Sequence, residues 1–277
     1  MENEGPGGGR WIEVAPDRLT RWLDSFAERH GGATAEASQE TVTFRAADGA
    51  MAECHVPFPP LAAEAPADGP PDGGTAGTAA AVAGAPHSPG APHSPGAPHS
   101  PGAPHSPGTA DSAGTAQRAA DAYAGYGERI AAHACADRTV GVFLVRLGGY
   151  AAGIFTGPAP SLAASKVGSR LVHGRSAAGG TSQHRFARRR EKQASGALSA
   201  AADTAVAVFA PYAGRIDAVV LGGDRRAMAQ LRDDPRLAPY FGLAVERFLT
   251  VPDPRLTVLR GTPRLFRSVR IRLTGPA

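Results

Sequence analysis

Cysteine, lysine and aromatic residues are scarce in this 277-residue chain. The only cysteines, Cys54 and Cys135, lie far apart and in no metal-ligand spacing. This excludes a disulfide scaffold and a zinc ribbon or finger, and favours a reduced, cytoplasmic setting. No signal peptide is expected from the acidic N-terminus, and the most apolar window, 140–155, is interrupted by Arg146 and by glycines. We therefore expect no membrane span.

Glycine and proline are abundant, with 35 and 25 residues, and they gather in one segment. Residues 84–107 repeat Gly-Ala-Pro-His-Ser-Pro four times, and the surrounding stretch 65–117 has no aromatic residue, leucine or isoleucine. Such a stretch cannot bury enough apolar surface to offset its chain entropy, which predicts a disordered, partly polyproline-like linker. Its histidines could bind metal loosely, but repeat expansion in a tolerant segment explains them more simply: His87, His93, His99 and His105.

Two ordered pieces remain, 10–61 and 118–277. The first combines a helix that begins at Pro16 and a hairpin that turns at Asp48-Gly49. One helix and one hairpin form too small a core to stand alone. We therefore expect the first piece to pack on the second, with 65–117 inserted into a single fold.

The second piece alternates apolar strand patterns with helix patterns. The pattern predicts a mixed β-sheet with packed helices, an α/β fold bordering on α+β. The expected elements are a helix over 119–134, a hairpin of 139–147 and 150–155, a strand over 161–167, a helix over 184–209, a strand over 216–221, a short helix from Asp224 and a last strand over 268–273.

Positive charge is concentrated in residues 166–192, which hold eight basic residues and one acid, Glu191. The segment carries +7 while the whole chain carries +4, so the remainder carries −3. A solvated charged face is the usual outcome of a charge run, but helix faces usually alternate in sign, and here the compensating acids are missing. The segment therefore indicates a polyanion site. Its basic residues are Lys166, Arg170, Arg175, Arg185, Arg188, Arg189, Arg190 and Lys192.

A loop without large apolar residues, 174–183, lies inside this basic segment and precedes the long helix. Ser182 is suited to cap a helix that begins near Gln183. The second half of that helix, from Ala194, has an apolar 3-4 pattern, whereas 184–193 holds Phe186 as its one large apolar residue. We expect the first half to project beyond the core and to carry a small polar group at the tip of a basic stalk.

The loop sequence Gly179-Gly180-Thr181-Ser182-Gln183, followed by the arginine-rich start of the helix, resembles the catalytic loop of the Vms-type release-factor-like peptidyl-tRNA hydrolases, closest to their actinobacterial branch. Further similar stretches are 53–58, 140–147, 164–170 and 219–225, so the resemblance covers most of the chain outside the repeat. The family is similar in fold to the middle domain of eukaryotic class-one release factors, whose loop ends in Gly-Gly-Gln. The two residues between glycine and glutamine, Thr181 and Ser182, depart from that loop, although the Ser-Gln ending matches the Vms-type one.

The resemblance implies hydrolysis of the ester between a nascent peptide and the terminal adenosine of tRNA, with no metal or cofactor. Gln183 would be the catalytic residue, Gly179, Gly180, Thr181 and Ser182 would shape the loop, and the basic residues named above would hold phosphates. The implied partners are peptidyl-tRNA and the RNA of stalled large ribosomal subunits, with no membrane partner; we expect a monomer. Glycine allows close approach of the backbone to RNA.

Two other functions stay open. A non-catalytic RNA-binding or ribosome-docking module would use the same basic helix. A metal-dependent nuclease would need clustered acids; strand and helix ends offer Asp137, Asp203, Asp217 and Asp224, but no paired spacing supports two-metal chemistry, and structural roles are simpler. His173 and His184 flank the loop, where phosphate contact or simple exposure explains them better than acid–base catalysis.

Overall fold

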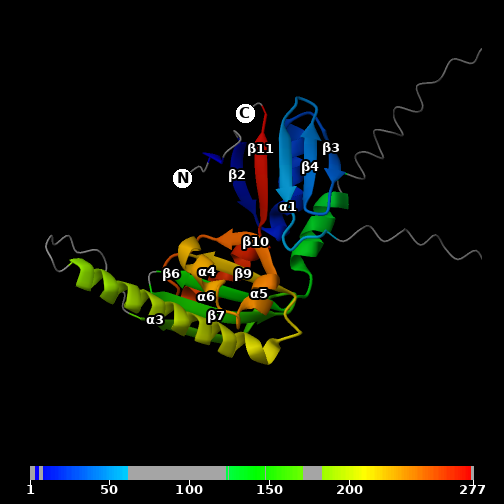
Figure 1. Ribbon diagram of the computed structural model, residues 1–277. Helices are drawn as coiled ribbons and strands as arrows, with labels where there is room; N and C mark the ends of the chain where they lie inside the picture. Colours follow the sequence, from blue (N-terminus) through cyan, green and yellow to red (C-terminus); the bar gives the residue numbers. More distant parts are fainter. Residues whose placement is uncertain are drawn as a thin grey trace, which may run out of the picture. The chain divides into compact units, whose positions relative to one another are not determined.

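The computed structural model describes residues 4–5, 9–61, 123, 125–146, 148–170 and 183–275, with the backbone alone for 4–5 and 183–191. Residues 1–62 and 117–277 belong to one compact unit, and the described residues form two β-sheets within it (Figure 1). The predicted linker, 65–117, lies wholly outside the described residues. Its disorder, and the division into segments at 61, 65 and 118, stay predictions.

The first sheet joins the two ends of the described chain. Its strand order is β1-β2-β11-β5-β4-β3, with every neighbouring pair antiparallel. The strands are β1 (Glu4–Gly5), β2 (Gly9–Val14), β3 (Ala33–Ala37), β4 (Thr41–Ala46), β5 (Met51–His55) and β11 (Val269–Thr274). The predicted hairpin is confirmed as β4 and β5, with Gly49 at a positive φ of 90°. The predicted last strand also forms, as β11, and lies between β2 and β5.

Helix α1 (Pro16–Arg29) covers this sheet because Leu19, Leu23 and Phe26 fall on one helix face and are buried. The inward residues of the strands complete the core, among them Phe44 and Ile271. A helical stretch at 125–135, which agrees with the helix predicted over 119–134, adds Ile130 to the same cluster.

The second sheet is mixed, as predicted, with the order β10-β9-β6-β7-β8. Its strands are β6 (Val140–Arg146), β7 (Gly149–Thr156), β8 (Ser161–Ser169), β9 (Ala218–Gly223) and β10 (Ala244–Leu249). Strands β6, β7 and β8 form an antiparallel meander, whereas β6, β9 and β10 run parallel. The parallel strands are connected through helices, as parallel pairs require.

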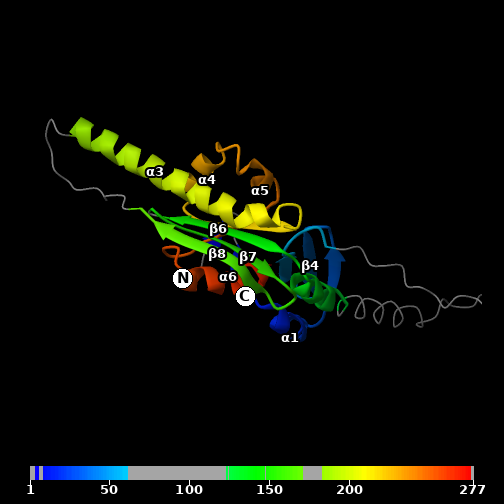
Figure 2. The same cartoon turned by 90° about the horizontal axis from the view of Figure 1, so that it is seen from below.

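Helices cover both faces of the second sheet (Figure 2). Helix α3 (Gln183–Phe209), α4 (Arg225–Leu231) and α5 (Ala238–Gly242) lie on one face, and α6 (Leu256–Arg267) lies on the other. Side chains alternate between the two cores along β6: Phe143 packs under α3, and Leu144 packs toward α6. Strands β1, β2, β3 and β10 and helices α5 and α6 were not predicted from the sequence. Helix α6 is hard to foresee because it contains Gly261 and Pro263, which normally interrupt helices.

Arg247 on β10 links the second sheet to the first. Its guanidinium donates hydrogen bonds to Glu13 Oε1 on β2 at 2.8 Å, and to Ser268 Oγ at 2.9 Å, just before β11. The side chain is 15% exposed, and burial lowers the pKa of its guanidinium. A partly buried arginine with these partners holds β10 against the ends of β2 and β11.

Among the described residues, one segment, Lys192–Tyr212, is long and apolar enough to cross a membrane by length and composition. It contains the buried alanines Ala197, Ala201 and Ala205, which pack on the second sheet. A helix that packs on a core passes the same test, and we interpret this segment as such a helix.

Candidate functional site

Helix α3 begins at Gln183 and ends at Phe209, in agreement with the helix predicted over 184–209. Its first part extends beyond the second sheet, and its second part lies across that sheet (Figures 1 and 2). Among the side chains described, from Lys192 onward, the first buried one is Ala197. At 1.5 Å per residue, Gln183 therefore lies about 20 Å along the helix from this first core contact.

The predicted site residues fall into three groups. The positions of Gly179, Gly180, Thr181, Ser182 and Arg175 lie outside the described residues, so the Ser182 cap and the loop geometry stay predictions. For Gln183, Arg185, Arg188, Arg189 and Arg190 the structure describes the helical backbone. Lys166, Arg170 and Lys192 are described in full, and all three are exposed.

Two of these cations stand beside α3 at the end of β8. Ala164 packs into the core beneath α3, so Lys166, two residues further along the same strand, lies on the same face of the sheet. The Arg170 backbone N–H donates to the Gly148 carbonyl at 2.8 Å, which holds the end of β8 against the β6–β7 turn. The Arg170 Nη1 atom lies 3.8 Å from the position that a Cβ on Gly196 would occupy. The fold thus brings Lys166 and Arg170 to the side of the basic helix.

Three of the four acids proposed for a nuclease have structural partners. Asp224 caps α4 by accepting hydrogen bonds from the backbone N–H groups of Arg226 and Ala227, at 2.7 and 3.3 Å. Asp217 accepts from the Thr139 N–H at 2.7 Å, and Asp203 pairs with Arg236 at 2.8 Å. No group of three His, Cys, Asp or Glu side chains suited to a metal ion occurs in the part of the chain that the structure describes. These three carboxylates, on Asp203, Asp217 and Asp224, therefore serve local structure.

Comparison with known proteins identifies the chain as release-factor-like. Residues 138–272, from just before β6 into β11, match the model of a release-factor family. This family is described as the Actinobacteria/chloroflexi VLRF1 release factor, and the match supports a Vms-like, release-factor-like protein. The resemblance inferred from the loop and the basic helix is thereby confirmed, and the match supports a translation-related role.

Among solved structures, the crystal structure of the archaeal translation termination factor aRF1 is similar at 13% sequence identity, with a TM-score of 0.35. The similarity covers 47% of this chain and 36% of that factor, so this chain spans about a third of the factor's length. No curated protein matches the chain.

Proposed function

We propose that this protein is a peptidyl-tRNA hydrolase that releases nascent peptides from tRNA on stalled large ribosomal subunits. The observation that supports this most directly is the position of Gln183 at the first turn of a helix that extends beyond the second sheet, about 20 Å along the helix from Ala197, the first buried side chain among those described. The match to a release-factor family supports the same reaction class. A projecting helix of this length suits reaching into a narrow RNA-lined site.

The chemistry needs a positioned water and a stabilised oxyanion or leaving hydroxyl. The neutral Gln183 side chain can accept a hydrogen bond from the water and donate one to the developing charge, and nearby backbone N–H groups can add further donors. The remaining acceleration comes from holding the ester and the water in the right orientation. In this proposal ribosomal RNA forms the rest of the site. In this proposal Gly179, Gly180, Thr181 and Ser182 give the loop the close backbone approach that the reaction requires.

The basic residues would hold the RNA. Lys166 and Arg170 flank α3 from β8, Lys192 lies on α3 itself, and the arginines at 185 and 188–190 belong to the projecting part. Residues 166–192 together carry a net charge of +7, which complements a partner rich in phosphate groups. We propose that peptidyl-tRNA and large-subunit RNA are the partners, and that the protein acts as a cytoplasmic monomer.

The catalytic role of Gln183 is tested by Gln183→Ala in single-turnover peptide release at saturating protein. The expected loss is about 100-fold or more, the scale for one preorganised polar group. Gln193→Ala, ten residues further along the same helix, is the matched control and should release peptide at the wild-type rate. Gln183→Glu should fail as well, since a carboxylate cannot donate a hydrogen bond. Wild-type release by Gln183→Ala would contradict the proposal and favour the docking module.

The RNA-binding role is tested by the triple variant Arg188→Ala, Arg189→Ala and Arg190→Ala. Each lost contact to single-stranded phosphate should reduce the slope of log affinity against log salt by about 0.7, so the triple change should reduce it by about 2. The matched control removes three exposed arginines from α1, namely Arg18, Arg21 and Arg29. An equal change of slope in both triple variants would refute a specific role for the projecting helix.

A further inference from the structure

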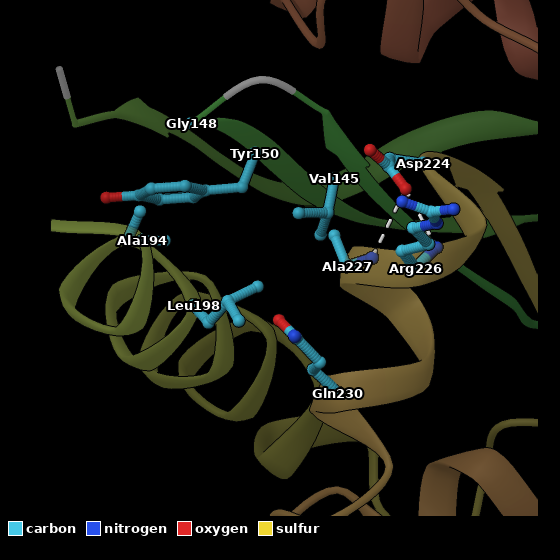
Figure 3. Close-up of a pocket in the computed structure, with 10 residues that line it drawn as sticks. Val145, Gly148, Tyr150, Ala194, Leu198, Asp224, Arg226, Ala227 and Gln230 are labelled. Carbon is cyan, nitrogen blue, oxygen red and sulfur yellow. Dashed lines mark hydrogen bonds between the residues drawn. The ribbon is translucent and has the colours of Figure 1, made fainter. Parts of the chain in front are cut away.

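A pocket of about 200 Å³ lies at the root of the projecting helix (Figure 3). It is bounded by α3, by α4, and by the ends of β6 and β7 where they meet near Gly148. Three segments far apart in the sequence build it, and for this reason the sequence analysis did not find it. The pocket belongs to the region matched by the release-factor family.

The walls of the pocket are apolar and firmly held. Val145, Ala194 and Leu198 line it together with the ring of Tyr150, and the ring lies beside Ala194 in Figure 3. The Tyr150 side chain is 8% exposed, and its ring rests on Gly168 so closely that a Cβ there would lie 2.5 Å from it. The fixed ring thus forms one wall of a preformed apolar slot.

Polar groups at the opening come from α4. The Gln230 side chain reaches toward Leu198 (Figure 3), and its amide makes no hydrogen bond to any residue that the structure describes. Arg226 also lines the pocket and is exposed. Asp224 is the one acid among the described residues that line the pocket, and its Oδ1 atom accepts the two capping hydrogen bonds of α4. The pocket thus combines an apolar slot, an amide that can both donate and accept, and a cation.

The volume restricts what this slot can hold. Pockets for drug-sized ligands measure about 300–1,000 Å³, so a dinucleotide or a comparable cofactor exceeds this one. At about 30 Å³ per molecule, the same space would hold six or seven waters. One planar ring system is the largest group that fits with its edge at Gln230.

We propose that this pocket binds a single unpaired nucleobase of large-subunit ribosomal RNA. The base would insert into the apolar slot between Val145, Leu198 and the wall formed by Tyr150, and would present its edge to Gln230. Its backbone phosphate would meet Arg226. The inference rests on the proposed function for the identity of the RNA. In that function the tRNA ester lies at Gln183, about 17 Å along α3 from Ala194, so the RNA beside the root of the helix is the ribosomal RNA around it.

The pocket is tested with two six-nucleotide ribose-phosphate chains of equal charge, one without bases and one with a single adenine. One base inserted into the pocket is expected to raise the affinity of the full-length protein about tenfold, which corresponds to about 1.4 kcal/mol. Ala194→Phe places a ring in the pocket and should abolish this gain. Ser195→Phe adds the same ring at an exposed neighbouring position and should preserve it. Gln230→Ala changes an exposed residue, so this variant should fold normally. Its affinity gain from the base should be about threefold smaller than that of the wild-type protein. Absence of a gain in the wild-type protein, or an equal gain in Ala194→Phe, would overturn the proposal.

The source of the nucleotide is tested by base-specific chemical probing of isolated large subunits that carry peptidyl-tRNA. We expect a ribosomal RNA base that wild type and Ser195→Phe protect and Ala194→Phe leaves reactive. Protection that depends on the pocket and falls on the tRNA alone would refute the ribosomal source. Gln183→Ala should bind the two short chains like wild type, so failure of the catalytic proposal and failure of the pocket proposal give different results.

Discussion

Gly223→Ala should destabilise the protein strongly, because the position combines a positive φ with a backbone contact. Gly223 ends β9 with a φ of 102° and pairs with Val145 on β6. A methyl group there would overlap the Val145 carbonyl oxygen and would lie 2.8 Å from its carbonyl carbon. Both neighbours are main-chain atoms within a sheet, so a rotamer change cannot relieve the overlap.

The free-energy loss follows from three contributions. A left-handed backbone conformation costs a residue with a Cβ about 1–2 kcal/mol. Separation of the strands would break the hydrogen bond from the Asp224 N–H to the Val145 carbonyl, 2.7 Å long, for about 1 kcal/mol. Displacement of packed elements adds about 1–3 kcal/mol. The free energy of unfolding should therefore fall by about 3–6 kcal/mol, a large part of the 5–15 kcal/mol typical of a domain.

Thermal unfolding followed by circular dichroism provides the assay. At about 2–4 °C per kcal/mol, Tm should fall by at least about 6 °C. Gly261→Ala is the matched control, because this glycine is exposed in α6 and a Cβ there would have no atom within 4 Å. Alanine should raise the free energy of unfolding by about 0.5–1 kcal/mol, since it favours the helix more than glycine does. A Gly223→Ala protein that melts within about 1 °C of wild type would refute the reasoning.

The remaining predictions concern the link between the sheets and two half-buried histidines. Arg247→Ala should lower the free energy of unfolding, measured by urea titration, by about 1.5–3 kcal/mol, the range for hydrogen bonds to charged groups. A loss below about 0.5 kcal/mol, which is typical of a surface substitution, would contradict the role of Arg247 as a link. Burial lowers the pKa values of His55 and His133 from the ordinary 6.5, so the unfolded chain takes up protons first and stability should fall as the pH drops from about 7.5 to about 5. The double variant His55→Gln with His133→Gln should flatten this decline in Tm, and an unchanged decline would assign it to other groups.

The sequence alone was sufficient for the elements with strong local signals. The apolar 3-4 spacing predicted α1 and the core-packing part of α3, and both were confirmed. Asp48-Gly49 marked the turn between β4 and β5, and Asp224 was predicted as a helix cap and is one. The loop and the arginine run led to the release-factor family, which the match over residues 138–272 confirmed. The catalytic role of Gln183 stays a prediction.

Other elements had no such signal. Strand β10 mixes charged and apolar residues because it is the half-buried edge strand of its sheet, and α6 carries Gly261 and Pro263 in its interior. The strand over 268–273 was predicted from its alternation, but alternation identifies the buried face of a strand and not its partners. The partners of β11 are β2 and β5, which lie more than 200 residues earlier in the chain.

Some properties depend only on residues within a few positions of one another: helix periodicity, turn chemistry, capping and charge. The sequence by itself therefore determined the helices and hairpins with strong local signals, the basic segment, and the position of Gln183 at a helix start. The tertiary structure alone decided which strands pair, why Gly223 must lack a side chain, and where Lys166 and Arg170 stand beside α3. It also created the pocket of Tyr150 and Gln230. Each of these depends on backbone and side-chain contacts between distant segments, which exist only after the chain has packed.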